Sequence, residues 1–450
     1  MYLFKKLLYF LPYIIFKPKV FFYLFKINNF KYLDRTEVEK HQLNRIKKII
    51  DFAYKNNRFY QAHWQLAGVT LEINDLKDLK KFPIISKDLL REAQAKNYLT
   101  SKPFQKKRLH SDFTTGSTGQ PFNVLKDLRC YNIHFAEYLS AKKYYDYELG
   151  DREIRLWRGS LSESITQKIK FLLTGKKTIC IYDPMDPINS RLTEGRIDEI
   201  IDELILLKPK YIDAFVSALV LISHRLEKRK IQLTNLKAIV TGAETLDVFD
   251  RKKIETAFGV RIFNRYGGTE FGLIGHECEL QTKTDHYLHL SEFTTYFELD
   301  DQTNELIITD LFNYAMPLIR YKTGDIAIFA KTFCKCGISS AMISEIQGRA
   351  NDLIVLSDKS YVSSHIWHNY FKKYNWIKKY QIIQDKIDLF TIRLDVELNC
   401  IPDDELQEIK LKVEKALMVK PKSVRWEIGL NSVKPGIGGK HQQCISNLKM

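Results

Sequence analysis

The sequence predicts a mixed α/β fold made of two domains of unequal size. A chain of 450 residues exceeds the roughly 250–300 residues at which one hydrophobic core stops growing. Helix-like and strand-like patterns alternate in its middle, and the segment after residue 350 has a separate pattern of its own. Hydrophobic residues make up 45% and charged residues 28% of the chain, which is typical of a folded protein with a sizeable core.

Helices and strands are expected to alternate through the middle of the chain. The expected order is a helix that ends near Lys208-Pro209, a strand at 211–216, a helix from about Ser217, a strand at 236–240, a helix near 247–258 and a strand near 260–264. Strands that alternate with helices favour parallel pairing.

The flanking regions have other patterns. Residues 37–66 are predicted to form one amphipathic helix, because apolar residues recur there at intervals of three and four. A polar turn at 300–304 between short strands at 298–299 and 305–310, with a further strand at 325–329, favours antiparallel pairing. The last segment predicts a small α+β unit, with strands at 352–356, 389–398 and 424–428 and a helix at 403–418.

The chain is strongly basic, with a formal net charge of +16 and an isoelectric point of about 9.2. Such a charge suits nucleic acid, an anionic membrane surface or phosphate-bearing ligands, but most of it is explained by solvated surface. No zinc finger, aromatic RNA-binding signature or basic zipper is present, so we predict no nucleic-acid partner. Seven cysteines, an odd number, argue against a secreted disulfide framework and favour a cytoplasmic protein.

The N-terminal segment is apolar and basic. Its longest apolar run, Leu7–Phe16, is about half of the roughly 20 residues needed to span a bilayer, and no small-residue cleavage site follows it. We therefore predict neither a transmembrane helix nor a signal peptide. A helix here could rest on the inner face of a membrane as a peripheral contact, or pack against the body of the protein.

Residues 111–121, SDFTTGSTGQP, form a loop rich in hydroxyls and glycines just before an apolar run at 122–125. Glycines let the backbone approach a polyphosphate closely, and hydroxyls donate hydrogen bonds to its oxygens. The loop lacks the lysine of the GxxxxGK[ST] motif, so an ordinary surface turn is the alternative.

The residue order of this loop resembles the phosphate loop of the adenylate-forming superfamily. Further motifs similar to those of the superfamily follow in its order: Thr241-Gly242-Ala243-Glu244, Asn264-Arg265-Tyr266-Gly267-Gly268-Thr269-Glu270, Arg320-Tyr321-Lys322-Thr323-Gly324-Asp325, Gly348-Arg349-Ala350-Asn351-Asp352 and Gly438-Gly439-Lys440. The branch resembled is that of the phenylacetate-CoA ligases, and within it the capsular-polysaccharide-biosynthesis proteins of the CapK type, through Phe59-Tyr60, Phe82-Pro83-Ile84, Ser217-Ala218-Leu219 and Cys334-Lys335-Cys336-Gly337. The resemblance covers nearly the whole chain from about Leu79 onward.

This resemblance implies an architecture and an activity. The implied N-terminal adenylation domain, residues 1–349, has mixed sheets flanked by helices and a small β-barrel-like subdomain, and residues 350–450 form a smaller, mobile α+β lid. The implied reaction activates a carboxylic acid with ATP as an acyl-adenylate, then transfers the acyl group to coenzyme A, in capsule or surface polysaccharide biosynthesis. A sugar amine or hydroxyl as the acceptor, or a non-catalytic nucleotide-binding partner in polysaccharide assembly, is the alternative. The acid and the oligomeric state, for which a homodimer is one option, stay open.

The resemblance also implies roles for individual residues. Lys440, Glu270 and Thr269 are the implied catalytic residues, where Lys440 stabilises the reacting carboxylate, Glu270 holds Mg²⁺ and Thr269 binds the α-phosphate. The implied nucleotide-binding residues are Thr115, Gly116, Ser117, Thr118, Gly119, Gly242, Ala243, Glu244, Arg265, Tyr266, Gly267, Asp325 and Arg349. Among these, Tyr266 would stack on adenine and Asp325 would accept the ribose hydroxyls. Gln120 and Asn351 depart from the family pattern, and Asn351 puts the rotation of the lid at the hinge in question.

Two further sets of residues are candidates for binding. Cys278, Cys334 and Cys336 with His289 would form a structural zinc site, with His286 as the next choice for the fourth ligand and free thiols as the alternative. The substrate-pocket candidates are Tyr144, Tyr145, Trp157, Arg158 and Phe215, although aromatic residues more often belong to a core.

Overall fold

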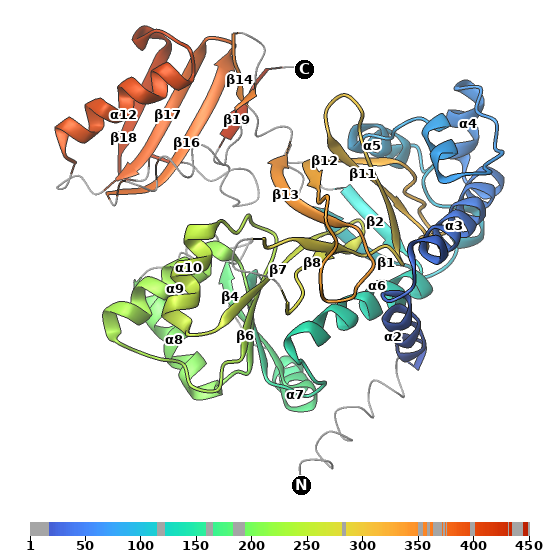
Figure 1. Cartoon of the computed structure of the whole chain (residues 1–450), viewed down its shortest axis with the longest axis horizontal. Coiled ribbons are helices and arrows are strands. Elements are labelled where there is room, and N and C mark those ends of the chain that lie inside the picture. The colour runs from blue at the N-terminus through green and yellow to red at the C-terminus, as the bar shows by residue number, and fades with distance from the viewer. Residues whose placement is uncertain are drawn as a thin grey trace.

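The computed structural model comprises a large N-terminal body and a smaller C-terminal domain that stands beside it (Figure 1). The residues that it describes are 18–114, 122–158, 165–182, 194–280, 285–349, 354–357, 361–362, 371, 374, 376–396, 401–430, 432–433 and 444–448. The architecture confirms the predicted mixed α/β class.

The body begins with a layer of helices. These are α2 (Pro18–Phe30), α3 (Arg35–Asn56), α4 (Arg58–Leu66), η1 (Leu76–Lys81), α5 (Lys87–Ala95) and η2 (Lys102–Phe104). The single helix predicted at 37–66 is wrong, because the chain breaks at Asn57. Asn57 has an extended backbone, its side chain caps α4 by accepting from the amides of Phe59 and Tyr60, and its amide nitrogen donates to the Leu99 carbonyl at 2.6 Å. A capping side chain therefore overrides the helical pattern.

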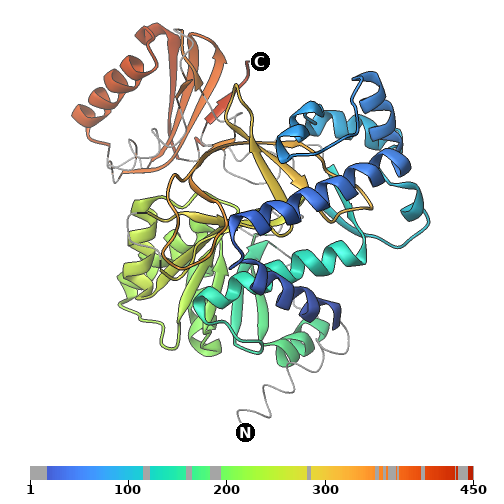
Figure 2. The same cartoon turned by 45° about the vertical axis from the view of Figure 1, so that its right-hand side comes forward.

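The centre of the body is an eleven-stranded sheet with the order β10-β11-β12-β13-β9-β8-β7-β6-β5-β3-β4. Its parallel half comprises β3 (Glu153–Arg158), β4 (Lys176–Tyr182), β5 (Tyr211–Ala214), β6 (Ala238–Thr241) and β7 (Arg261–Gly268). The connecting helices are α7 (Ile165–Thr174), α8 (Glu194–Leu207), α9 (Val216–Arg229) and α10 (Val248–Phe258), of which the last three lie side by side in Figures 1 and 2. The predicted alternation of parallel strands and helices is confirmed.

The other half of the sheet is antiparallel, as the polar turn at 300–304 predicts. Its strands are β8 (Gly272–His276), β9 (Leu288–Leu290), β10 (Thr295–Leu299), β11 (Glu305–Asp310), β12 (Tyr321–Phe329) and β13 (Met342–Arg349). A separate hairpin of β1 (His110–Thr114) and β2 (Phe122–Lys126) precedes α6 (Leu128–Ala141) and η3 (Lys142–Tyr145).

The C-terminal domain has its own sheet and core. Its elements are β14 (Ile354–Val355), β15 (Tyr361–Val362), β16 (Ile377–Lys386), β17 (Leu389–Val396), α12 (Asp403–Ala416), η6 (Pro421–Ser423), β18 (Val424–Gly429) and β19 (Cys444–Ser446). The four-stranded sheet has the order β18-β17-β16-β19, and α12 buries Ile409 and Val413 in the same core as Ile382 and Ile392. The predicted α+β character is confirmed, whereas the boundary at residue 349 stays a prediction.

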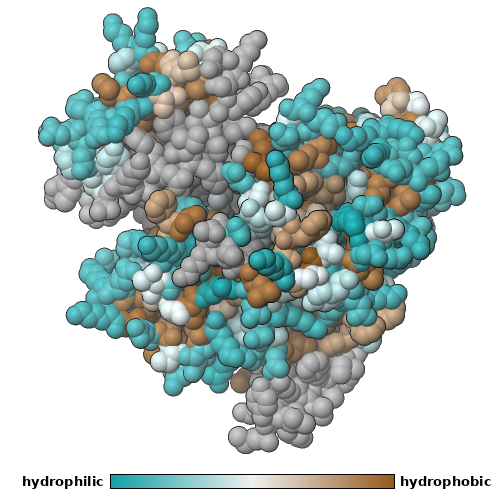
Figure 3. Space-filling model, in the orientation of Figure 1, coloured by the Kyte–Doolittle hydropathy of each residue, from teal (hydrophilic) through white to brown (hydrophobic). Residues whose placement is uncertain are grey.

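The face seen in Figure 3 is mostly hydrophilic, with scattered apolar patches. Among the helices that the described residues form, none is both long enough and apolar enough to cross a membrane.

Candidate nucleotide site

The two motifs predicted to contact the nucleoside meet where the sheet changes from parallel to antiparallel. Strand β7 pairs in parallel with β6 up to Asn264 and in antiparallel with β8 from Arg265 onward. The next residue, Tyr266, donates from its hydroxyl to Oδ2 of Asp325 on β12, at 2.5 Å. A stacking ring and a carboxylate that are 59 positions apart in sequence are thus brought together.

The hairpin after β7 holds Glu270 beside two groups that the sequence did not single out. Oε1 of Glu270 accepts from the Tyr321 hydroxyl at 3.2 Å and lies 3.5 Å from Nζ of Lys87. A Cβ at Gly268 would lie 3.3 Å from Oε2 of Glu270, and one at Gly267 would lie 2.6 Å from the Gly272 carbonyl oxygen. The hairpin therefore requires glycine at position 267, where the obstacle is backbone, whereas a side chain at position 268 would press on the Glu270 carboxylate.

The buried side chain of Lys126 links the β1–β2 hairpin, whose strands flank the hydroxyl-rich loop, to Thr269. Nζ of Lys126 on β2 donates to the Thr269 carbonyl at 2.6 Å. Thr114 at the end of β1 pairs with Phe122 at the start of β2, so residues 115–121 connect the two strands. Those residues themselves lie outside the described part of the chain.

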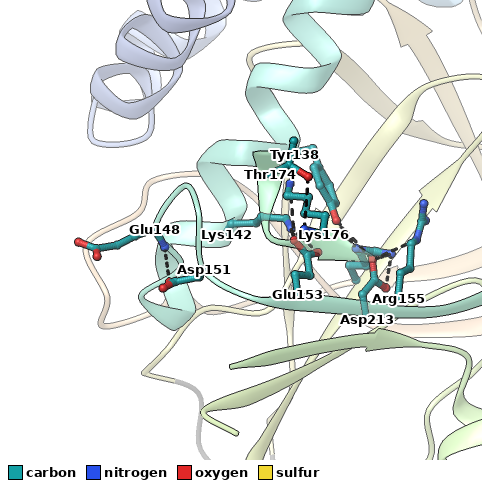
Figure 4. Close-up of polar contacts among 10 residues, drawn as sticks. Tyr138, Lys142, Glu148, Asp151, Glu153, Arg155, Thr174, Lys176 and Asp213 are labelled. Atoms are coloured by element: carbon teal, nitrogen blue, oxygen red, sulfur yellow. Dashed lines mark hydrogen bonds and ion pairs between the residues drawn. The ribbon is translucent and has the colours of Figure 1, made fainter. Parts of the chain in front are cut away.

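Arg265, next to Tyr266, is held by a buried network that includes Tyr138 and Asp213, which are labelled in Figure 4. Its Nη2 donates to both carboxylate oxygens of Asp213 at 2.7 and 2.9 Å, and Asp213 also accepts from the Tyr138 hydroxyl at 3.3 Å. Asp213 is 1% exposed, and its charge outweighs burial and raises the pKa of Arg265. Arg265 is therefore a fixed cation next to Tyr266, and its predicted role in nucleotide binding stays a prediction.

A second buried ion pair lies beside this one in Figure 4. Nζ of Lys142 is 2.5 Å from both carboxylate oxygens of Glu153, and Nζ of Lys176 is 3.5 Å from Oε2. Burial alone would raise the pKa of Glu153, but the two ammonium groups lower it to about 2. Glu153 is consequently ionised at neutral pH.

The turn after β6 packs against Arg265. A Cβ at Gly242 would lie 3.0 Å from both Cγ and Nε of Arg265, which requires glycine. Ala243 has a φ of +68°, and Glu244 is exposed. This turn follows the carboxyl end of a parallel strand, where ligands bind in open α/β sheets.

The Phe-Pro-Ile stretch also contributes to the site. The Ile85 amide donates to the Arg320 carbonyl at 2.9 Å, and the Lys322 amide donates to the Ile85 carbonyl at 3.0 Å. The Arg320 guanidinium is paired with Glu298 on β10. Lys87, two residues after Ile85, thereby reaches Glu270.

Some predicted residues cannot be placed. Thr115, Gly116, Ser117, Thr118 and Gly119 lie outside the described residues, as do Lys440, Gln120 and Asn351. Only the backbone of Arg349 is described, at the end of β13 paired with Asp325. Their assigned roles stay predictions.

Four residues around the site were not predicted: Lys87, Lys126, Asp213 and Tyr321. Tyr321 stands inside a recognised motif and could have been found there. The other three are a lysine or an aspartate in segments with no motif, so only their three-dimensional neighbours identify them.

The structure separates the substrate-pocket candidates. Trp157, near the carboxyl end of β3, and Phe215, directly after β5, stack with their ring centroids 3.9 Å apart. Tyr145 packs on Tyr211 at the other end of β5, and Tyr144 stacks on His276. The side chain of Arg158 is not described. Among the four candidates whose side chains are described, only Trp157 and Phe215 lie together at the carboxyl edge of the parallel strands.

The predicted zinc ligands lie together at the rim of the antiparallel half. The sulfurs of Cys278, Cys334 and Cys336 and a ring nitrogen of His289 all lie within 4.8 Å of one another. Sγ of Cys278 is 3.5 Å from Sγ of Cys334, and Sγ of Cys336 is 3.4 Å from Nε2 of His289. His286 instead faces Glu277.

This donor set has the chemistry of a tetrahedral zinc site. Nδ1 of His289 is 3.2 Å from the Ser340 hydroxyl, which leaves Nε2 to face the sulfurs. A hydrogen bond from Cys278, together with His289, lowers the pKa of Cys336 to about 3, so a thiolate is present at neutral pH. Three sulfurs and one imidazole at these separations fit a Cys₃His centre.

Comparison with known proteins begins with the C-terminal domain. Residues 354–447 match the family model of the CapK C-terminal domain. This C-terminal segment is therefore similar to the CapK C-terminal domain. This confirms the predicted resemblance at the end of the chain where Lys440 lies.

Relatives extend the resemblance over the rest of the chain. The phenylacetate-coenzyme A ligase of Thermus thermophilus is 25% identical over 72% of this chain and 73% of its own, and the protein CapK of Staphylococcus aureus is 23% identical over 91% and 89%. A 2-hydroxyisobutyryl-CoA ligase in the postadenylation state has the same fold, with a TM-score of 0.72, 17% identity and coverage of 93% of this chain and 91% of its own. The chain thus has the fold of this CoA ligase over 93% of its length.

Proposed function

We propose that this chain activates a carboxylic acid with ATP as an acyl-adenylate and then transfers the acyl group to coenzyme A. The observation that carries the proposal is the hydrogen bond between Tyr266 and Asp325, with Glu270 on the adjoining hairpin. It unites two motifs of adenylate-forming enzymes, one on β7 and its hairpin and one on β12, where the sheet changes from parallel to antiparallel. The likeness to the phenylacetate-coenzyme A ligase of Thermus thermophilus and to the 2-hydroxyisobutyryl-CoA ligase supports the same reaction.

The described side chains suit the parts of a nucleotide. The Tyr266 ring would cover the adenine, and the Asp325 carboxylate, which the Tyr266 hydroxyl holds in place, would accept the ribose hydroxyls. Lys87 would donate to phosphate oxygens while it compensates the charge of Glu270.

Glu270 is the residue that would hold Mg²⁺, because its Oε2 faces the space left by Gly268. The metal, when bound, neutralises the charge that develops on the leaving pyrophosphate. Ser117, Thr118 and Thr269 would donate to the phosphates, and Lys440 would stabilise the charge transferred from the attacking carboxylate.

ATP–pyrophosphate exchange with a panel of aryl and short acyl acids tests the first half-reaction. We expect exchange with at least one acid, and a fall of about 10²–10³-fold for Lys440→Ala. Lys420→Ala, an exposed lysine of the same domain, is the matched control and should retain exchange. ATP binding without exchange for any acid would instead identify a non-catalytic nucleotide-binding partner.

The acceptor and the pathway form the second part of the proposal. Mass spectrometry of products formed with and without coenzyme A distinguishes a thioester from an ester or amide on a sugar. The likeness to the protein CapK supports a role in capsule or surface polysaccharide biosynthesis. An acyl-sugar formed without coenzyme A would replace the thioester step but leave adenylation intact.

We also propose that Cys278, Cys334, Cys336 and His289 bind one structural zinc ion. The set supplies four ligands, which closes a tetrahedral shell and leaves no position for substrate. Its role would be to clamp the β8–β9 connection to the loop before β13.

A further inference from the structure

A groove between α2, α3 and the start of α6 brings together four cations and three aromatic rings. Its volume is about 450 Å³, and Lys26, Arg45, Lys48 and Arg129 line it, together with Phe22, Tyr23 and Phe293. No carboxylate is among its lining residues. No ion pair among the described residues involves any of the four cations.

The two arginines are held close together without a counter-ion. The guanidinium carbon of Arg45 lies 4.0 Å from the centroid of the Phe312 ring, and that of Arg129 lies 6.0 Å from the same centroid. Burial, with Arg129 nearby, lowers the pKa of Arg45, whose side-chain partner is the Tyr314 hydroxyl. Two like charges over one ring create a position that favours an anion.

Exposed apolar side chains continue from this groove along α2. Phe22 is 55% and Phe25 68% exposed, and Nζ of Lys26 lies 4.4 Å from the Phe22 ring centroid. Rings beside cations are the composition of helices that lie in the interface of an anionic bilayer. A soluble phosphate would need the cations but would leave the rings in water.

The N-terminal segment that leads into and includes α2 contains no carboxylate side chain that could pair with the cations of the groove. The first 33 residues contain six lysines and no aspartate or glutamate. Residues 1–17 therefore contain no carboxylate side chain that could neutralise the groove.

We propose that this groove binds the phosphate headgroups of an anionic phospholipid membrane, with Phe22 and Phe25 entering the interface. Lys26, Arg45, Lys48 and Arg129 contact the headgroups, and each contributes about fivefold to binding. In this binding mode the protein lies on the membrane surface and does not span the bilayer. Salt releases it, because the attraction between the cationic side chains and the anionic headgroups is screened beyond a Debye length of about 8 Å.

The test is flotation of the full chain with vesicles of phosphatidylcholine alone and of phosphatidylcholine with about one-third phosphatidylglycerol. We expect binding to the anionic vesicles only, and binding about 30-fold weaker or more for Lys26→Glu/Lys48→Glu. The control is Lys40→Glu/Lys47→Glu, which makes the same change in net charge with exposed lysines of α3 outside the groove. The binding of this control variant to anionic vesicles should weaken far less than that of the groove variant.

Phe25→Ser supplies an independent variant, because a side chain 68% exposed contributes little to folding. Roughly tenfold weaker binding is expected if the ring enters the interface. Circular dichroism melting verifies that every variant is folded. Equal losses for the groove pair and the control pair would reduce the binding to net charge and overturn the proposal, as would equal binding to neutral vesicles or no binding at low salt.

Discussion

The two halves of the eleven-stranded sheet hold their shape in different ways. The parallel half buries ion pairs, Arg265 with Asp213 and Lys142 with Glu153, beneath strands whose side chains are covered on both faces. The antiparallel half also buries an ion pair, Arg320 with Glu298, but in addition carries the Cys₃His set at its rim. The candidate nucleotide site lies where the halves meet, and Tyr266 from one half is bonded to Asp325 from the other. The site is thus sensitive to both halves but depends on each through different chemistry.

The largest effect is expected from breaking the contact across the junction. Asp325→Ala removes the acceptor of the Tyr266 hydroxyl and the proposed ribose ligand, so kcat/KM for ATP in the exchange assay should fall about 100-fold. Tyr266→Phe keeps the aromatic ring and loses one hydrogen bond, so kcat/KM for ATP should fall only about fivefold. Equal losses for the two variants would contradict the separate roles of ring and carboxylate.

In the parallel half, Asp213→Asn should lower the free energy of unfolding by about 3–5 kcal/mol, because it leaves Arg265 buried without its counter-charge. Asp198→Asn is the matched control, since Asp198 also forms a two-oxygen pair, with Arg225, but at the surface. It should cost no more than about 1 kcal/mol. Urea unfolding measures both, and a control as costly as Asp213→Asn would remove the distinction between buried and exposed pairs.

In the antiparallel half, removal of the metal tests the contribution of the Cys₃His site to stability independently of the buried ion pairs. Cys334→Ser, or a strong chelator, should release about one zinc per chain and lower the free energy of unfolding by about 3 kcal/mol when free zinc is near 100 times Kd. Cys180→Ser, at a buried cysteine outside the cluster, should retain the metal. Metal analysis and thermal melting give the answer, and a wild-type chain purified with zinc present but binding none would end the assignment.

The sequence patterns that predict the two halves of the sheet also differ. The alternation of strands and helices predicted the parallel half, and the polar turn at 300–304 predicted the antiparallel pairing. Motif order led to Tyr266, Glu270 and Asp325, because glycines and polar residues at fixed spacing are local signals. The break at Asn57 was missed, since a cap competes with an apolar pattern that continues across it.

Buried ion pairs could not be predicted in the same way. Asp213 sits in an apolar strand and meets Arg265 only because β5, β6 and β7 are neighbours in the sheet. Lys87 reaches Glu270 through the pairing of Ile85 with the start of β12, a contact between segments more than 230 positions apart. Partners at such separations leave no local pattern in one sequence.

The smallest expected effect is on the pH dependence of stability, and it arises from a buried ion pair of the parallel half. Because Lys142 and Lys176 hold the pKa of Glu153 at about 2, below its ordinary value of 4.5, folding gains stability from this group above about pH 4.5. That gain is lost as the pH falls from about 4.5 to about 2, where Glu153 becomes protonated in the folded state as well. Glu153→Gln should therefore be less stable than wild type at pH 7 by about 2 kcal/mol, and the difference should shrink below pH 4. Urea unfolding of both chains at several pH values measures it. A difference that stays constant down to pH 2 would mean that Glu153 acts through its shape and hydrogen bonds, and that its charge contributes nothing to the parallel half.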